Sequence, residues 1–466
     1  MNTPRRMKSC GVRWRNLEAN LMRELLLTFY GDDFTGSADA MEALALNGVR
    51  SVLFLSPPSP ELLAEKFSDV EAIGVAGASR AMTPAQMEAN LPPIFSRLRK
   101  LDARLFHYKT CSTFDSSPQI GSIGKAYEIG QKVFASPFVP LLVGATELKR
   151  YCVFGNLFAT VANETFRLDR HPMMSRHPVT PMDEGDIRLH FGKQTDATIA
   201  LFDVLHLSGE ADQVNEKFSA LLATRPDVVL FDTLESAHLA TAGRLIWNSN
   251  AKFVIGSSGI EYALAAHWQR PGVTYGAAGA VEQNIVMAGS CSSATLTQIE
   301  WAEANGYASL RLDAALLVDE GTAEIERIRL QKAALEILDA GRNLILYSAR
   351  GPHDPLMQSS NASLRERGFD KLKIRERLGK MQGILLRDLL LDSGLRRVCV
   401  AGGDTSSHVV SQLGIYALEL RTPMAPGSPL CRAYSENSKL DGLEIAMKGG
   451  QHGRVDYFEC IRCGVY

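Results

Sequence analysis

Short apolar segments alternate with amphipathic segments along most of the chain. The apolar segments read as buried strands, and the others have the 3.6-residue spacing of helices. In the first part the predicted strands are Glu24–Tyr30, Ser51–Leu55, Ala72–Val75, Ala103–Tyr108 and Val139–Val143, with helices at Pro84–Lys100 and Gly124–Phe134. The alternation stops over residues 151–190 and resumes with strands at Thr198–Val204, Val228–Phe231 and Phe253–Ile255. This order is typical of βαβ units and a mostly parallel sheet.

A glycine-rich segment with one proline, Trp268–Gly279, separates this series from a second one. Strands are predicted there at Asn284–Ala288, Ala308–Leu312, Asn343–Tyr347, Arg397–Val400, Tyr416–Leu420 and Leu443–Met447. Because 466 residues are too many for one core, we predict an α/β fold with two domains, each a mostly parallel sheet flanked by helices. The predicted boundaries are 22–270 and 283–466. Residues 1–21 are predicted to be a disordered extension, unless the chain starts at Met22.

The composition narrows the classes of function. The formal net charge is −2 and no long run of one charge occurs, which argues against nucleic acid or an anionic membrane as the main partner. No apolar run approaches the roughly 20 residues that span a bilayer. Eight scattered cysteines favour a reducing cytoplasm, and Cys460 and Cys463 lack the second pair that a zinc site needs. The oligomeric state stays open, with a homo-oligomer as one alternative.

The first candidate site follows the first predicted strand, where Asp32 and Asp33 precede Thr35, Gly36 and a helix. Open α/β sheets bind ligands at the carboxyl ends of strands, and a helix start favours an anion. A single aspartate would suit an ordinary helix cap, but two of them followed by Thr and Gly favour a functional loop. Asp32 and Asp33 are therefore the catalytic candidates, and Thr35 and Gly36 are candidates for contact with a substrate.

Two further segments of the first half are candidates for substrate binding. Lys109 directly follows the predicted strand Ala103–Tyr108 and opens a hydroxyl-rich loop that includes Ser112 and Thr113, which suits a polyhydroxylated anion. An ordinary polar loop is the alternative. The segment 167–184 carries three Arg, two His and three Pro, and from it we select His177 and Thr180. The alternatives there are local ion pairs or a contact between copies of the chain.

The second half has three loops at strand ends that suit phosphate, and Gly427 lies in a further rigid turn. Consecutive glycines let backbone amides approach an anion, Asp404 could reach a magnesium ion, and Thr405 would cap a helix at His408–Leu413. The loops lack the spacing of a Walker A or GxGxxG motif. The candidate nucleotide ligands are Ser290, Ser292, Gly402, Gly403, Asp404, Thr405, Gly427, Lys448, Gly449, Gly450 and Gly453.

From Met22 to its end, the chain resembles the four-carbon acid sugar kinase family. The resemblance is carried by Asp-Asp-x-Thr-Gly at 32–36, Gly-Ser-x-Ser at 289–292, Gly-Gly-Asp-Thr at 402–405 and Lys-x-Gly-x-x-Gly at 448–453. It implies an N-terminal acid-sugar domain, a C-terminal ATP domain and an active site between them. It also implies ATP-dependent phosphorylation of a terminal hydroxyl on a tetronate or 3-oxo-tetronate, with Mg²⁺. The implied ATP ligands are Ser290 or Ser292, the 402–405 loop and Gly449 to Gly453.

The chain departs from the family at one place. Where the family usually has Lys-x-Asp-Ser-Thr-x-Arg-Gly, this chain has Cys111 for Asp, Asp115 for Arg and Ser116 for Gly. The change alters how the acid is held, so a branched relative such as a 3-oxo-isoapionate becomes a candidate substrate.

We expect Asp32 or Asp33 to orient and deprotonate the acceptor hydroxyl, and the sequence leaves open which of the two does so. A phosphohydrolase is one alternative, but its Asp-x-Asp pattern is absent. The other alternative is a sugar-acid sensor with a degenerate nucleotide domain.

Overall fold

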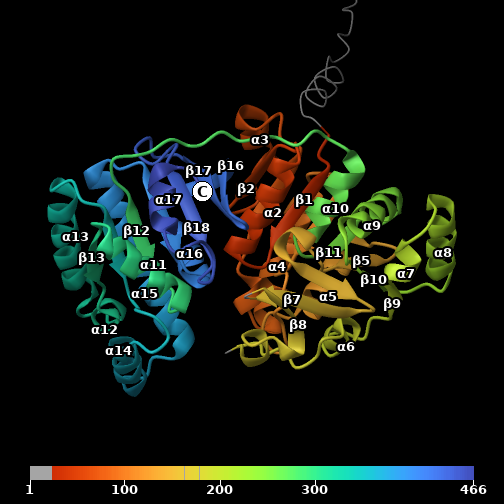
Figure 1. Cartoon of the computed structure of the whole chain (residues 1–466), viewed down its shortest axis with the longest axis horizontal. Coiled ribbons are helices and arrows are strands. Elements are labelled where there is room, and N and C mark those ends of the chain that lie inside the picture. The colour runs from red at the N-terminus through yellow and green to blue at the C-terminus, as the bar shows by residue number, and fades with distance from the viewer. Residues whose placement is uncertain (1–23, 162, 178) are drawn as a thin grey trace, which may run out of the picture.

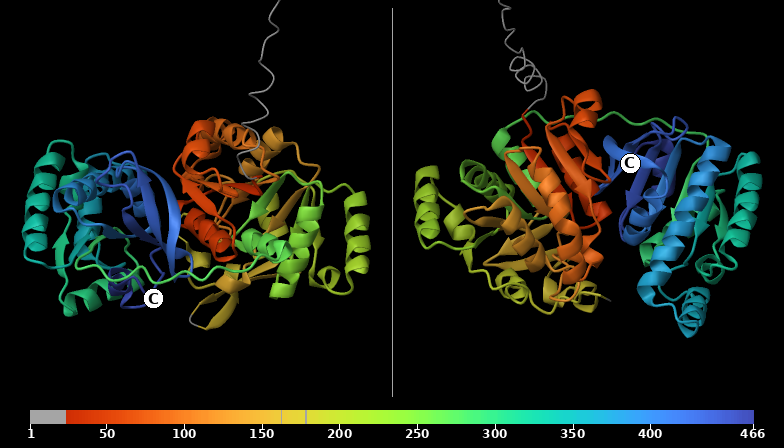
Figure 2. Two further views of the ribbon diagram at one scale, coloured as in Figure 1. Left: turned by 90° about the horizontal axis from the view of Figure 1, so that it is seen from above. Right: turned by 180° about the vertical axis from the view of Figure 1, so that it is seen from behind.

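The computed structural model describes residues 24–161, 163–177 and 179–466. The extension predicted at 1–21 lies outside them. Two halves lie side by side, and a connection without helix or strand, residues 269–284, joins them along the outside of the molecule (Figures 1 and 2). The fold is the predicted two-domain α/β fold.

The N-terminal half is built on eight parallel strands in the order β2-β3-β1-β4-β11-β5-β10-β9. These are β1 (Leu27–Gly31), β2 (Ser51–Phe54), β3 (Ala72–Ala76), β4 (Leu105–Lys109), β5 (Val139–Leu142), β9 (Ile199–Phe202), β10 (Val228–Phe231) and β11 (Phe253–Gly256). The helices are α2 (Phe34–Leu46), α3 (Pro60–Lys66), α4 (Pro84–Arg99), α5 (Ile123–Phe134), α6 (Ile187–Gly192), α7 (Val204–Leu207), α8 (Ala211–Ala223), α9 (Ser236–Asn248) and α10 (Gly259–Trp268).

The C-terminal half continues with parallel strands in the order β13-β14-β12-β15-β18, followed by the antiparallel strands β17 and β16. They are β12 (Ile285–Ala288), β13 (Ala308–Arg311), β14 (Leu344–Tyr347), β15 (Arg397–Ala401), β16 (Ile415–Ala425), β17 (Ser428–Ser435) and β18 (Glu444–Lys448). Its helices are α11 (Ser293–Ala304), α12 (Ala314–Val318), α13 (Ala323–Asp339), α14 (Pro355–Glu366), α15 (Lys371–Ser393), α16 (Gly403–Val410) and α17 (Tyr457–Cys463).

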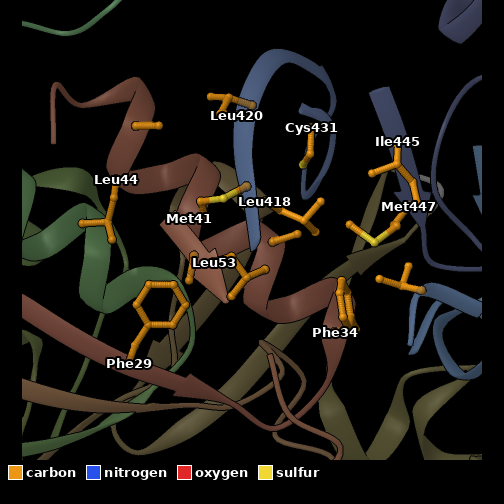
Figure 3. Packing of buried hydrophobic residues seen from close by; sticks show 14 of the residues in the cluster. Phe29, Phe34, Met41, Leu44, Leu53, Leu418, Leu420, Cys431, Ile445 and Met447 are labelled. Atoms are coloured by element: carbon orange, nitrogen blue, oxygen red, sulfur yellow. The ribbon is translucent and has the colours of Figure 1, made fainter. Parts of the chain in front are cut away.

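The two halves share one sheet. Strand β16 pairs antiparallel with β2, with Leu418 opposite Leu53, so the described residues form a continuous 15-stranded sheet. Helix α2 covers this junction, and a single hydrophobic cluster crosses it. Figure 3 shows Phe34 and Met41 of α2 together with Leu418 of β16 and Met447 of β18. Because α2 begins directly after Asp33, this packing holds the Asp32–Gly36 loop beside the C-terminal half.

The structure also has elements that the sequence pattern did not predict. The segment 151–190 includes most of a three-stranded antiparallel sheet of β6 (Arg150–Val153), β7 (Asn156–Val161) and β8 (Glu164–Arg167). Short 3-10 turns lie at η1 (Ser79–Ala81), η2 (Thr146–Leu148), η3 (Leu168–Arg170) and η4 (Met174–Arg176). Among the helices of the described ranges, none is long and apolar enough to cross a membrane.

Candidate active site

Asp33 caps α2 and binds an arginine at the same time. Its Oδ1 accepts a hydrogen bond of 2.8 Å from the Gly36 amide, and its Oδ2 lies 2.5 Å from Arg80 Nη2. Arg80 comes from η1, directly after β3. A Cβ at Gly36 would lie 2.5 Å from Asp33 Oδ1 and 3.1 Å from Lys109 Nζ, so this turn requires a glycine. Two charged side chains from different strand ends therefore converge on the start of α2.

Asp32 has a different environment from its neighbour. It is buried, and its Oδ1 has no hydrogen-bond partner among the described residues. Burial raises the pKa of Asp32 to about 7, with Asp33 adding to the effect and Arg80 and Lys109 opposing it. A carboxyl group that titrates near neutral pH and keeps an unused oxygen can take up a proton during a reaction.

Lys109 ends β4 beneath the same loop. Its buried Nζ lies 3.4 Å from Asp39 Oδ2 and donates to the Thr110 carbonyl at 3.1 Å. Burial acts against the charged form, but Asp39 and Glu261 outweigh it and the pKa of Lys109 is raised. The lysine is thus a fixed positive charge below the start of α2.

The altered segment after β4 also faces this site. Thr113 donates a hydrogen bond to Asp115, and its hydroxyl lies 3.1 Å from Cys111 Sγ. Asp115 Oδ2 lies 3.9 Å from Arg80 Nη1. Asp115 therefore adds a carboxylate beside the arginine that already binds Asp33, and the site has more acceptor oxygens than Asp32 and Asp33 supply alone.

The glycine loops of the C-terminal half meet at two helix starts. Ser292 caps α11 through the Thr295 amide at 3.1 Å, whereas the N-cap of α16 is Gly402, with φ at +127° and no capping side chain. Helix α16 starts at Gly403, earlier than the predicted start at His408. Thr405 therefore lies in the first turn of α16, and the prediction that Thr405 caps this helix is wrong. The uncapped amides of α16 leave a place for an anion.

Close contacts explain why these loops need glycine. A Cβ at Gly289 would lie 2.0 Å from Thr405 Oγ1, and a Cβ at Gly450 would lie 2.6 Å from Ser290 Oγ. Ser292 also donates to the Gly450 carbonyl. Three loops, which follow β12, β15 and β18, therefore form one surface at the carboxyl ends of neighbouring parallel strands.

This surface encloses a cavity of about 270 Å³. Its lining comprises Gly289, Ser290, Cys291, Ser348, Arg375, Leu378, Gly379, Gln382, Gly402, Gly403, Thr405, His408 and Gly450. Four of these residues come from α15, which the sequence did not mark as part of a site. A possible signal was Gly379 within a helical pattern, because a Cβ there would lie 2.5 Å from His408 Cβ.

Lys448 lies under the loop that it opens. It is buried, its Nζ donates to Thr295 Oγ1 at 3.0 Å and to the Gly450 carbonyl at 3.4 Å, and burial lowers its pKa to about 8. In this arrangement Lys448 ties the loop to α11.

The N-terminal loops that carry Asp33 and Arg80 meet the glycine loops of the C-terminal half at the start of α16. A Cβ built on Gly403 would lie 3.5 Å from Thr35 Oγ1 and 3.9 Å from Arg80 Nη2. The uncapped helix start therefore faces the loop with the two aspartates. Arg80 was not predicted, and no local motif marks it, because it reaches the site from the end of β3 by tertiary packing.

Contacts are given by the structure for three other predicted ligands as well. Thr180 donates its amide to His177 Nδ1 at 3.1 Å within their own loop, and their contact with a substrate stays a prediction. Gly427 lies in the β16–β17 turn, where it donates to Glu42 at 3.0 Å, and not in the lining of the cavity. The side chain of Asp404 lies outside the described part of the structure. Within that part, no group of three or more His, Cys, Asp or Glu residues is placed to hold a metal ion.

Comparisons with known proteins match both halves. A model of a sugar-binding N-terminal domain matches residues 27–264, and one of a nucleotide-binding C-terminal domain matches residues 285–458. The chain is 46% identical to a 3-oxo-isoapionate kinase from Paraburkholderia graminis, over 94% of each chain. It is 30% identical to a 3-oxo-tetronate kinase from Methylobacterium radiotolerans, over 93% of this chain and 98% of the other. The crystal structure of the Haemophilus influenzae protein HI1011 has the same fold, with a TM-score of 0.69 at 23% identity over 93% of this chain and 98% of the other.

Proposed function

Because this chain belongs to the four-carbon acid sugar kinase family and is a carbohydrate-acid kinase, we propose that it transfers the γ-phosphoryl group of ATP to a primary hydroxyl of a small sugar acid. One observation carries the proposal: Gly403, at the uncapped start of α16, lies beside Thr35 and Arg80. A phosphate bound at that helix start would lie next to the loop that holds Asp32. A cytoplasmic location and assembly into a homo-oligomer stay predictions for this protein.

The nucleotide would bind on the C-terminal half. The α16 amides, the Ser290 hydroxyl and the backbone near Gly450 form a polar cavity whose chemistry fits phosphate. ATP supplies the phosphoryl group, and its Mg²⁺ neutralises charge on the phosphates. The glycines keep side chains out of the space that the phosphates need.

On the N-terminal half, Asp32 would act as the base. The hydroxyl oxygen of the sugar acid forms a bond to the γ-phosphorus, the bond from that phosphorus to the departing ADP breaks, and the hydroxyl proton passes to Asp32. The unpartnered Oδ1 and the pKa of about 7 support this role. Asp33, held by Arg80 and by the Gly36 amide, would orient the hydroxyl, and Lys109 would supply positive charge for the acid.

For the substrate we propose a branched 3-oxo acid of the 3-oxo-isoapionate type. The relative at 46% identity carries that name, whereas those named 3-oxo-tetronate kinase are 26–30% identical. Asp115 supports the choice, because a carboxylate beside Arg80 can accept a hydrogen bond from the additional hydroxyl of a branched acid.

A substrate panel tests this function. Purified protein with ATP and Mg²⁺ is given 3-oxo-isoapionate, 3-oxo-tetronate, D-threonate and D-erythronate in turn, and ADP release is followed with a coupled assay. ADP release that depends on an acid sugar, with the product located by ³¹P NMR on a primary hydroxyl, supports the proposal. Phosphate release from a sugar phosphate would instead indicate a phosphohydrolase, and binding without turnover would indicate a sensor.

A further inference from the structure

His452 lies in the Lys448–Gly453 loop, where the two halves face each other, and the proposed reaction gives it no role. A Cβ on Gly449 would lie 3.4–3.5 Å from atoms of the His452 ring. The residue as a whole is solvent-exposed, whereas the Nδ1 side of its ring faces the buried Ser428 hydroxyl. The protein atoms around the ring exclude water and lower the pKa of His452. The positive charges of Lys448 and Arg150 lower it further, while Asp39 and Asp33 oppose the change. Gly427, the residue before Ser428, donates to Glu42 of α2, and Ser428 in turn bonds to the His452 ring, so the imidazole lies between the phosphate loop and the half of the molecule that holds Asp33.

The hydrogen bond to Ser428 fixes which ring nitrogen carries the proton. Ser428 Oγ lies 2.9 Å from His452 Nδ1, and Ser428 is fully buried at the start of β17. Among the described residues, the Ser428 hydroxyl bonds to this nitrogen, and a buried hydroxyl donates its proton where it can. Nδ1 is then the acceptor, so the neutral ring carries its proton on Nε2.

Other contacts hold the ring and its partner in place. Gln298 Nε2, from α11, donates to three successive carbonyls, those of His452 at 3.0 Å, Gly453 at 3.2 Å and Arg454 at 2.9 Å. The Tyr457 hydroxyl donates to the Ser428 carbonyl at 3.0 Å. Both sides of the Ser428–His452 bond are therefore anchored, and the Nε2–H group is oriented before any ligand arrives.

We propose that His452 is a catalytic residue whose Nε2–H donates a hydrogen bond to a non-bridging oxygen of the phosphoryl group during transfer, and that Ser428 is a positioning residue that holds the required tautomer. The proposal rests on the proposed function. His452 keeps its proton throughout, because the proton of the acceptor hydroxyl goes to Asp32. A fixed donor aimed at oxygens that gain charge stabilises the transition state more than the bound substrates.

Three variants test the two roles through kcat and KM. His452→Phe removes the donor, and we expect kcat to fall about 100-fold while KM for ATP and for the acid changes less than about threefold. His452→Gln offers an amide N–H near the Nε2 position and should recover about tenfold of that loss. Ser428→Ala should lower kcat about fivefold, because the ring is free to take the other tautomer.

A double-mutant cycle separates positioning from general damage to the fold. Ser428→Ala should have no further effect on kcat in the His452→Phe background, because the donor that it positions is gone. Thermal unfolding of each variant checks that the chain folds.

The proposal is overturned if His452→Phe keeps the wild-type kcat, or if it loses ATP binding with kcat unchanged. It is also overturned if Ser428→Ala costs the same in both backgrounds. Absence of turnover in the wild-type protein with every acid sugar would overturn the proposed function itself, so the two failures are distinguishable.

Discussion

Arg80 Nη2 lies 2.5 Å from Asp33 Oδ2, while the other oxygen of Asp33 accepts the Gly36 amide. Both oxygens of Asp33 are therefore occupied by hydrogen-bond donors. Asp32, the adjacent residue, is buried and keeps an oxygen without a partner. The two carboxylates of one loop thus differ in environment, and we infer that Asp33 orients the substrate while Asp32 accepts its proton.

Replacing each aspartate by asparagine should separate these roles. We expect Asp32→Asn to lower kcat by about 10³-fold with ATP affinity unchanged, because the base is lost and the cap of α2 is kept. Asp33→Asn keeps an oxygen for the Gly36 amide but loses the charge that pairs with Arg80, so it should raise KM for the acid as well as lower kcat. Steady-state kinetics and calorimetric titration with ATP measure both effects. Near-normal turnover in Asp32→Asn would contradict the role of Asp32 and leave Asp33 as the base.

The pH dependence of kcat/KM should report on Asp32. Because a base must be unprotonated, kcat/KM should rise with pH up to about 7 and then level off. Arg80 lowers the pKa of Asp32, so Arg80→Gln should move the rising limb to higher pH, and Arg80→Lys should move it less. The measurement is kcat/KM between pH 5 and 9 for the three proteins. A limb at the same pH in all of them would exclude Asp32 as the titrating group.

Local sequence signals were sufficient for part of this site. Asp32–Gly36 is contiguous and lies between an apolar strand and a helix, so its place at a strand end could be predicted from the pattern alone. The loops after β12, β15 and β18 converge because parallel strands end at the same edge of a sheet. The β2–β16 pairing, by contrast, joins segments more than 350 residues apart in the sequence, and no local pattern encodes such a contact. Arg80 and the cavity side of α15 depend on the same long-range packing.

Gly289→Ala should weaken nucleotide binding without a general loss of the fold. The added methyl group would lie 2.0 Å from Thr405 Oγ1, so the loop that starts α16 must move. Gly276→Ala is the matched control, because nothing lies within 4 Å of a Cβ there. We expect ATP affinity to fall at least tenfold in Gly289→Ala and to stay at the wild-type value in Gly276→Ala, as measured by calorimetry. Equal affinities in the two variants would show that the contact of Gly289 with Thr405 does not shape the nucleotide site.

Asp115→Asn should change the choice of substrate more than the overall rate. Asn keeps the size of the side chain but gives up one acceptor oxygen and the charge beside Arg80. We expect kcat/KM to fall about 10- to 100-fold for a branched 3-oxo acid and less than about threefold for 3-oxo-tetronate, since one lost hydrogen bond to a charged group is worth about 1.5–3 kcal/mol. Competition between the two acids in one reaction gives the ratio directly. A parallel fall for both acids would assign Asp115 to the support of Arg80 and not to selection of the branch.

The contact of Glu42 with the β16–β17 turn should make stability depend on pH. Glu42 is buried under the junction and accepts the Gly427 amide at 3.0 Å, and burial together with Asp39 raises its pKa to about 8. The folded state therefore keeps a proton that the unfolded state releases near pH 4.5, so this contribution to stability is complete below pH 4.5 and is lost as the pH rises to 8.

Glu42→Gln keeps the acceptor oxygen and does not titrate. Its free energy of unfolding in urea, relative to the wild type, should thus increase between pH 5 and pH 8 and stay constant above it. In the control Glu61→Gln, at the exposed start of α3, the difference should be flat over this range, because the pKa of Glu61 is lowered in the fold. A flat difference for Glu42→Gln as well would mean that Glu42 is ionised beneath the junction.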